Sequence, residues 1–319
     1  MARAYGSSAS LLLKRETAYG TAPSGDYIRM PFNRCTLGSE QGLIDDPVLG
    51  QGRDPYPPLQ DAIMDEGEIV VPVDPRYLGL WLTGLLGTPA TTDDGADPPA
   101  YTHVFASGKD SLPSYTIEVG HLQVPAYFRH TGVVFDSIAL EFARSGAAAA
   151  TISCVAQGEE RFTASQGGAP TKLDFARISQ FQGSISRAGS PVANLTAGSL
   201  AYANNLEKIE TIRSDGLIDG ADPTVASLTG TIEVRFADTT FIDLAADGTP
   251  VDLTFAYAID ENLKVSFAAH EVYLPKPTLG VEGPGGVQAR FDFQGARNEA
   301  EGRMLTVTLI NDLDGTDYS

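Results

Sequence analysis

The side chains that could carry out acid–base, nucleophilic or metal chemistry are scattered along the sequence instead of forming motifs. His270 and Glu271 lack the second histidine that a zinc-protease helix requires. The neighbouring carboxylates Asp45 and Asp46 could serve as a general acid and base, but such pairs in an acidic chain are typical of solvated loops. The sequence contains no nucleophile elbow, phosphate-binding loop or dinucleotide-binding glycine pattern. We therefore expect no catalytic residue, no metal site and no cofactor, and a protein that is not an enzyme.

The composition is that of a folded, acidic protein. The 319 residues include 41 Asp and Glu against 22 Lys and Arg, a formal net charge of -19. This charge disfavours a broad grip on phosphate backbones or anionic lipids. Cys35 and Cys154 have neither the number nor the spacing of a disulfide framework or zinc site, so we expect two free thiols. The apolar runs are shorter than a bilayer span of roughly 18 residues or a signal-peptide core, which predicts no membrane segment and folding in a cytoplasm.

The elements that must position any functional side chain are mostly β-strands. Apolar and polar residues alternate along many segments, as they do in strands with one buried face. These segments are 67–73, 115–120, 133–144, 231–236, 251–259, 290–293 and 304–310. Turn residues separate them, which favours antiparallel sheets. Two short helices are expected, one between Asp74 and Gly87 and one between Asp238 and Gly248, because Asp caps helix starts and Gly ends helices.

The two helices belong to an internal repeat. The sequences GEIVVPVDPRYLGLWLTGLLGTP from Gly67 and GTIEVRFADTTFIDLAADGTP from Gly230 share a Gly-x-Ile-x-Val strand, a helix preceded by Asp, and Gly-Thr-Pro. Chance matches of common sheet residues are the alternative, but the shared order favours duplication. We therefore predict a mainly β protein with two tandem antiparallel β-sandwich domains, each with one short flanking α-helix. The predicted domains are residues 1–165 and 166–319.

One segment distinguishes the first copy from the second. It is rich in Gly and Pro and reads VLGQGRDPYPPL from Val48 to Leu59. A long connection without its own structure is usually there to contact something, so we predict an extended arm near residues 43–60. Its candidates for intermolecular contact are Arg53 and Asp54, through ion pairs, and Tyr56, as an aromatic anchor. An ordinary flexible loop is the alternative.

Four segments in fixed order give the chain a family resemblance: 16–21, 67–89, 114–120 and 283–312. Together they resemble the major tail tube protein of long-tailed, siphovirus-type bacteriophages, in a form with a duplicated domain. The resemblance covers nearly the whole chain. It implies a β-sandwich flanked by a helix, similar in fold to the type VI secretion tube protein. It also implies a structural subunit of the virion tail that is assembled in the host bacterial cytoplasm, and that stacks in rings to form the channel for genome delivery.

The duplication changes what the resemblance implies about assembly. The simplest family member has one domain and forms hexamers, so two halves per chain suggest three chains per ring with pseudo-sixfold symmetry; a hexamer of chains is the alternative. The expected partners are further copies of the chain, a tape measure protein, a tail terminator and distal tail proteins. Double-stranded DNA would pass in transit without specific binding. An acidic lumen would repel phosphate at close range, and the candidate lumen-facing carboxylates are Glu68, Glu118 and Glu233.

A function from a different class is the alternative interpretation. A soluble two-domain β-sandwich binding module, for example for carbohydrate, would share the predicted fold. Such a module is expected to expose clustered aromatic side chains. The single tryptophan, Trp81, lies instead in the apolar segment of the first predicted helix.

Overall fold

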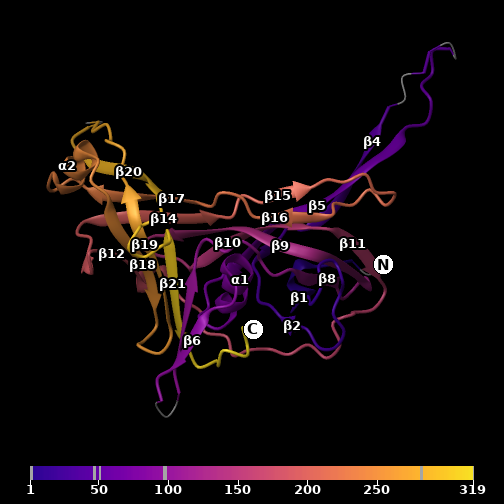
Figure 1. The fold of residues 1–319 in the computed structure, drawn as a ribbon, viewed down its shortest axis with the longest axis horizontal. Helices are drawn as coiled ribbons and strands as arrows, with labels where there is room; N and C mark the ends of the chain where they lie inside the picture. The colour runs from indigo at the N-terminus through magenta and orange to yellow at the C-terminus, as the bar shows by residue number, and fades with distance from the viewer. Residues whose placement is uncertain (1–2, 46–47, 50–51, 96–98, 281–282, 319) are drawn as a thin grey trace.

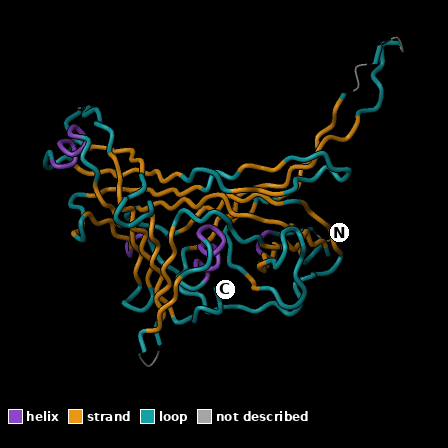
Figure 2. Tube along the Cα trace, viewed as in Figure 1, coloured by secondary structure: helices purple, strands orange, loops and turns teal. Residues whose placement is uncertain are grey.

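The computed structural model describes residues 3–45, 48–49, 52–95, 99–280 and 283–318. It consists mainly of antiparallel strands with two short α-helices, α1 (Tyr77–Leu86) and α2 (Thr240–Asp247) (Figures 1 and 2). The strands of the first half are β1 (Ala9–Arg15), β2 (Ile28–Arg29), β3 (Arg34–Cys35), β4 (Gly38–Ile44), β5 (Leu59–Pro72), β6 (Ala90–Asp93), β7 (Tyr101–Ala106), β8 (Tyr115–His121), β9 (Ala126–Phe142), β10 (Ala149–Ala156) and β11 (Gly158–Phe162). Those of the second half are β12 (Gly183–Arg187), β13 (Ser190–Pro191), β14 (Leu195–Ala203), β15 (Glu207–Ile209), β16 (Gly220–Asp222), β17 (Ser227–Arg235), β18 (Val251–Ala258), β19 (Lys264–Tyr273), β20 (Gln288–Gly295) and β21 (Leu305–Asn311). The predicted mainly β fold with two short helices is confirmed.

A long antiparallel layer runs through both halves of the chain. Its strands lie in the order β4-β5-β10-β9-β14-β17-β20. The crossing from the first half to the second is the pairing of β9 with β14, in which Leu140 lies opposite Leu200. Because this layer is continuous, hydrogen bonds join the two halves along a full strand, and a division into separate domains at residue 165 stays a prediction.

Two long strands, β9 and β19, each take part in a second layer. The first part of β9 pairs with β8 and β11, and β8 pairs in turn with β1. The first part of β19 pairs in the same way with β18 and β21, and β18 pairs with β12. In addition, β5 pairs with β10 as β17 pairs with β20. The two halves therefore follow one scheme of strand pairing, in which β1, β5, α1, β8, β9, β10 and β11 correspond to β12, β17, α2, β18, β19, β20 and β21.

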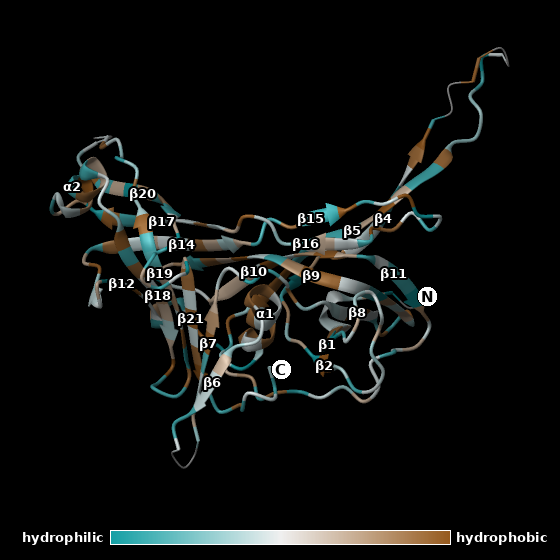
Figure 3. Ribbon diagram, in the orientation of Figure 1, coloured by the Kyte–Doolittle hydropathy of each residue, from teal (hydrophilic) through white to brown (hydrophobic). Residues whose placement is uncertain are grey.

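The two helices differ in how much of the chain covers them. Every residue of α1 is buried, and its Trp81 ring lies 5.1 Å from that of Phe135. No residue of α2 is buried. Figure 3 shows α1 as a hydrophobic helix within the body and α2 at one end of the molecule. Both helices end at a glycine with positive φ. Gly248 has the left-handed conformation (φ 64°, ψ 22°), whereas Gly87 combines a φ of 82° with an extended ψ of 177°.

The C-terminal segment reaches back to the first half. Strand β21 pairs with β7 of the β6–β7 hairpin, an element that has no counterpart after α2. Beyond β21, Tyr318 is 1% exposed and its hydroxyl donates to the carbonyl of Arg76 at 2.6 Å. The Arg76 guanidinium forms an ion pair with Asp312. The last residues that the structure describes therefore cover α1.

Candidate functional site

The most extensive functional candidate is one face of the long layer, which we call the polar sheet face. Cross-strand partners project to the same side of a sheet, so the register defines the face. One row of partners reads Val70, Thr151, Ala139, Ala201, Thr229 and Gln294, and the next reads Glu68, Ser153, Ser137, Ala203 and Ser227. All of these residues are partly or fully exposed. The polar sheet face is therefore lined at its centre by short Ser, Thr and Ala side chains.

The opposite side of the same layer is the hydrophobic core. Its corresponding row of partners is Ile69, Ile152, Ile138, Tyr202 and Leu228. Each of these side chains is at most 2% exposed. The strict alternation fixes the register, because a slip by one residue would bring this apolar row to the surface. Core burial thus determines which side chains the polar sheet face presents.

Charged side chains on the polar sheet face are largely paired. Its carboxylates are Glu40, Glu66, Glu68, Glu141, Glu233 and Asp292, and the cations on it or reaching it are Arg34, Lys208, Arg235 and Arg290. Arg34 lies 2.9 Å from Glu68, and Arg290 lies 3.2 Å from Glu233 and 3.0 Å from Asp292. Exposed pairs of this kind contribute only about 0–1 kcal/mol each to stability, but they place a cation beside most of the carboxylates. The six carboxylates and four cations leave the face with a small net negative charge.

The three carboxylates predicted to point away from the core have different positions. Glu68 and Glu233 lie on the polar sheet face, and both are partly exposed. Glu118 is 0% exposed, and its carboxylate accepts hydrogen bonds from the Ser165 hydroxyl and the backbone N–H of Gln166. The prediction that Glu118 lines an open surface is therefore wrong. Strand β8 is covered on both faces, because the chain after β11 folds back over the face on which the alternating sequence places Glu118.

The predicted arm is a hairpin made of β4, β5 and the connection between them. It projects from the body in Figure 1, with its tip far from the rest of the chain. Among the described residues, Arg53, Asp54 and Tyr56 are exposed and have no hydrogen bond or ion pair. Large apolar side chains are exposed along the same hairpin: Leu43, Ile44, Val48, Leu49, Leu59 and Met64. Asp46 lies outside the described residues. The exposed apolar side chains make the hairpin a candidate for contact with another molecule.

A buried ionisable cluster holds the base of this hairpin. Asp65 of β5 and His130 of β9 are buried, with His130 Nδ1 2.9 Å from an Asp65 carboxylate oxygen. Glu159 of β11 lies 3.8 Å from the other ring nitrogen and accepts a hydrogen bond from the Ser39 N–H of β4. The sequence places Asp65 in an acidic run typical of solvated surface, and no local signal reveals its partner 65 residues away. These contacts join four strands and orient the hairpin.

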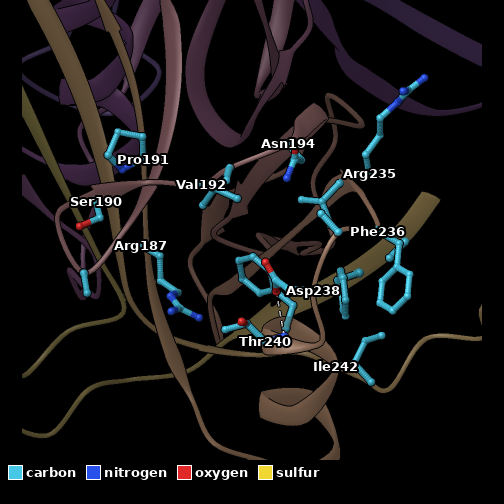
Figure 4. Close-up of a pocket in the computed structure, with 17 residues that line it drawn as sticks. Arg187, Ser190, Pro191, Val192, Asn194, Arg235, Phe236, Asp238, Thr240 and Ile242 are labelled. Carbon is cyan, nitrogen blue, oxygen red and sulfur yellow. Dashed lines mark hydrogen bonds between the residues drawn. The ribbon is translucent and has the colours of Figure 1, made fainter. Parts of the chain in front are cut away.

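The ordinary marks of an active site are weak throughout the described part of the chain. No group of three or more His, Cys, Asp or Glu side chains within it is placed to hold a metal ion. Cys154 is buried and Cys35 partly buried, and burial raises the pKa of both thiols. None of the helices described is long and apolar enough to cross a bilayer. A cleft of about 280 Å³ lies between the β12–β13 hairpin and α2 (Figure 4).

Comparison with known proteins identifies the family. A search of curated proteins returns no significant match. The family model described as "Phage tail tube protein" matches residues 6–295, which is nearly the whole chain. That family is one of structural proteins rather than enzymes. The match includes both halves, the hairpin of β4 and β5, and all strands of the polar sheet face. The chain belongs to the phage tail tube protein family.

Proposed function

We propose that this protein forms rings of three chains that stack into the tail tube of a siphovirus-type phage, with the polar sheet face lining the channel. The observation that carries the proposal is the continuity of that face across both halves. A wall made by one chain must expose a polar surface on one side and bury its core on the other, and the long layer does both. The ring would be built in the host cytoplasm and would remain in the virion tail.

The shared pairing scheme supports three chains per ring. Each half would contribute four strands to the wall: β4, β5, β10 and β9, and then β14, β17, β20 and β19. Six halves would then give about 24 strands at a spacing of ~4.8 Å. With a tilt of ~40°, the wall has a diameter of roughly 48 Å before side chains, which leaves room for a DNA duplex. A ring of six chains is the alternative.

The lining would let DNA pass without holding it. Short Ser, Thr and Ala side chains offer no long cationic group to grip a phosphate, and two arginines of the face, Arg34 and Arg290, form ion pairs with Glu68, Glu233 and Asp292. The excess of acidic residues in the whole chain opposes tight binding. The proposed channel is therefore weakly charged, and paired carboxylates take the place of the strongly acidic lumen expected from net charge. A tape measure protein would occupy it before DNA does.

The hairpin would join one ring to the next. Its exposed apolar side chains and the tip residues Arg53, Asp54 and Tyr56 would be covered by a subunit of the neighbouring ring. Deleting residues 48–58 should leave a folded protein that forms rings but not tubes. Tubes of normal length from this deletion would refute the inter-ring role. A tail terminator and distal tail proteins would occupy the two ends of the stack.

Mass measurement and electron microscopy of the purified protein test the assembly. Rings with the mass of three 33.8 kDa chains are expected, together with hollow tubes; rings of six chains would refute the trimer, and a monomer at all concentrations would refute the tube. The lining is tested by Glu68→Lys and Glu233→Lys in phage, with Glu261→Lys in the β18–β19 turn as control. The first two should slow genome delivery while tubes still form. Delivery equal to that of the control would refute the lining.

A further inference from the structure

The interface between the two halves includes a short segment over the start of α1, residues 175–179, which we call the strap. The segment that precedes β12 crosses there, and the backbone N–H of Ala176 donates to the Asp74 carboxylate. The Phe175 ring meets the ring of Tyr77 edge-on at 6.2 Å. The N–H of Ile178 donates to the carbonyl of Val73 at 3.3 Å. An extended segment from the following half therefore closes the N-terminal end of this helix.

The corresponding place beside α2 is open. Asp238 precedes α2 as Asp74 precedes α1, but within the described chain its carboxylate accepts hydrogen bonds only from Thr240. The cleft next to it is lined by Val192, Phe241 and Ile242 (Figure 4), and Phe236 at its edge is 39% exposed. The guanidinium of Arg187 lies 5.3 Å from the Phe241 ring, and its Nη1 is buried with no hydrogen-bond partner in the described chain.

The sequence before β1 matches the strap. A one-turn 3-10 helix precedes β1 at Gly6–Ser8, and another precedes β12 at Gln180–Gln182. When the sequences are aligned on these two 3-10 helices, Ala2-Arg3-Ala4 corresponds to Ala176-Arg177-Ile178. Residues 3–7 are all exposed in the single chain. The first half thus has a segment of the strap type, and the second half has a helix that lacks a strap.

We propose that residues 3–5 of a second copy of this chain occupy the cleft beside α2, as residues 177–179 cover α1 within one chain. The occupant's backbone N–H groups would donate to the Asp238 carboxylate, and its carbonyl groups would accept from Nη1 of Arg187. The side chains of the strap would cover Phe236 and Phe241. The inference rests on the proposed function, because it requires that successive halves repeat around a ring.

Disulfide trapping in assembled tubes tests this contact. Ala4 and Ala237 correspond to Ile178 and Val73, whose backbones are hydrogen-bonded in the first half, and both alanines are exposed. In a Cys35→Ser background, mild oxidation of Ala4→Cys/Ala237→Cys tubes should give covalent dimers and closed trimers on a non-reducing gel. The matched control Ala4→Cys/Ala258→Cys should stay monomeric, because Ala258 lies at the far end of β18. Tubes without cross-links, or equal cross-linking in the control, would overturn the inference.

A deletion gives an independent outcome if the double variant does not assemble. Removing residues 2–4 takes away the exposed side chains of Arg3 and Ala4 and keeps the hydrogen bonds of Tyr5 to Gln123 and Ser8. The unfolding midpoint should therefore be unchanged while ring formation is lost. Normal rings from the deletion would overturn the inference and leave the proposed function intact. Failure of the unmodified chain to form rings would instead refute the proposed function itself.

Discussion

Replacing Tyr318 with alanine should destabilise the whole protein, although Tyr318 is followed by only one residue in the sequence. The ring is 1% exposed and lies against α1 so closely that a Cβ added at Gly79 would be 2.3 Å from it. It also meets the His103 ring edge-on at 4.8 Å. Removing a buried aromatic ring costs about 3–5 kcal/mol, because its packing is lost and a cavity remains. We expect Tyr318→Ala to lower the free energy of unfolding by that amount.

The hydroxyl of Tyr318 makes a separate contribution. It donates to the Arg76 carbonyl at 2.6 Å and accepts from Asn311 Nδ2 at 2.8 Å. Tyr318→Phe keeps the ring and leaves those two groups with fewer partners, so a loss of about 1–2 kcal/mol is expected. Tyr5→Ala is the control, since Tyr5 is 61% exposed and surface changes usually cost under ~0.5 kcal/mol. Urea unfolding followed by the fluorescence of buried Trp81 measures all three. A loss below about 1 kcal/mol for Tyr318→Ala would refute the packing argument.

Three further changes test the local arguments. Asp74→Ala should lower the free energy of unfolding in urea by about 2 kcal/mol, because three backbone N–H groups lose their acceptor. Asp238→Ala should lower it by less in the monomer. Equal losses would contradict the role of the strap at α1. Gly67→Ala should lower the free energy of unfolding by about 1–3 kcal/mol, because the new Cβ would lie 2.6 Å from the backbone of Leu37, and an unchanged value would show that β3 and β4 move freely. Burial raises the pKa of Tyr19 to about 12, so the folded state loses stability as pH rises from about 10 to 12. Over this pH range the urea midpoint of Tyr19→Phe should decline less steeply than that of the unmodified protein. Identical pH profiles would exclude Tyr19 as the cause of the decline.

The helices and the faces of the strands can be predicted from the sequence, because they depend on residues that are close together in the chain. Asp74 and Gly87 bound the first helix, because hydrogen bonds from a carboxylate to the first N–H groups and termination by a glycine with positive φ depend on neighbouring residues alone. Period-two alternation places Glu68 and Glu233 opposite the core for the same reason. The exposed connection within the hairpin of β4 and β5 is visible as a run of Gly and Pro, although the lengths of its strands are not.

Distant pairing limits what the sequence predicts. Alternation shows that Glu118 faces away from one core, but it carries no information about the segment near Ser165 that covers its other side. The partnership of Asp65 with His130 likewise depends on two strands meeting across the chain. Strands β7 and β8 follow one another in the sequence but pair with different strands, β7 with β21 of the other half and β8 with β1. Such contacts follow from topology, which local residue patterns do not encode.

The two helices are covered to different extents, and the proposed assembly uses this difference. Helix α1 is closed by the strap that precedes β12 and by the C-terminal Tyr318, so the first half is complete within one chain. Helix α2 has the same place in the pairing scheme but keeps Phe236 exposed and Arg187 Nη1 unpaired in the described chain. Under the proposal above, each copy would receive the next one at this open cleft and insert its own N-terminal segment into the preceding one. Such a heterologous contact closes into a ring when the rotation between successive copies is a whole fraction of a turn, and the proposed ring of three chains requires one third of a turn.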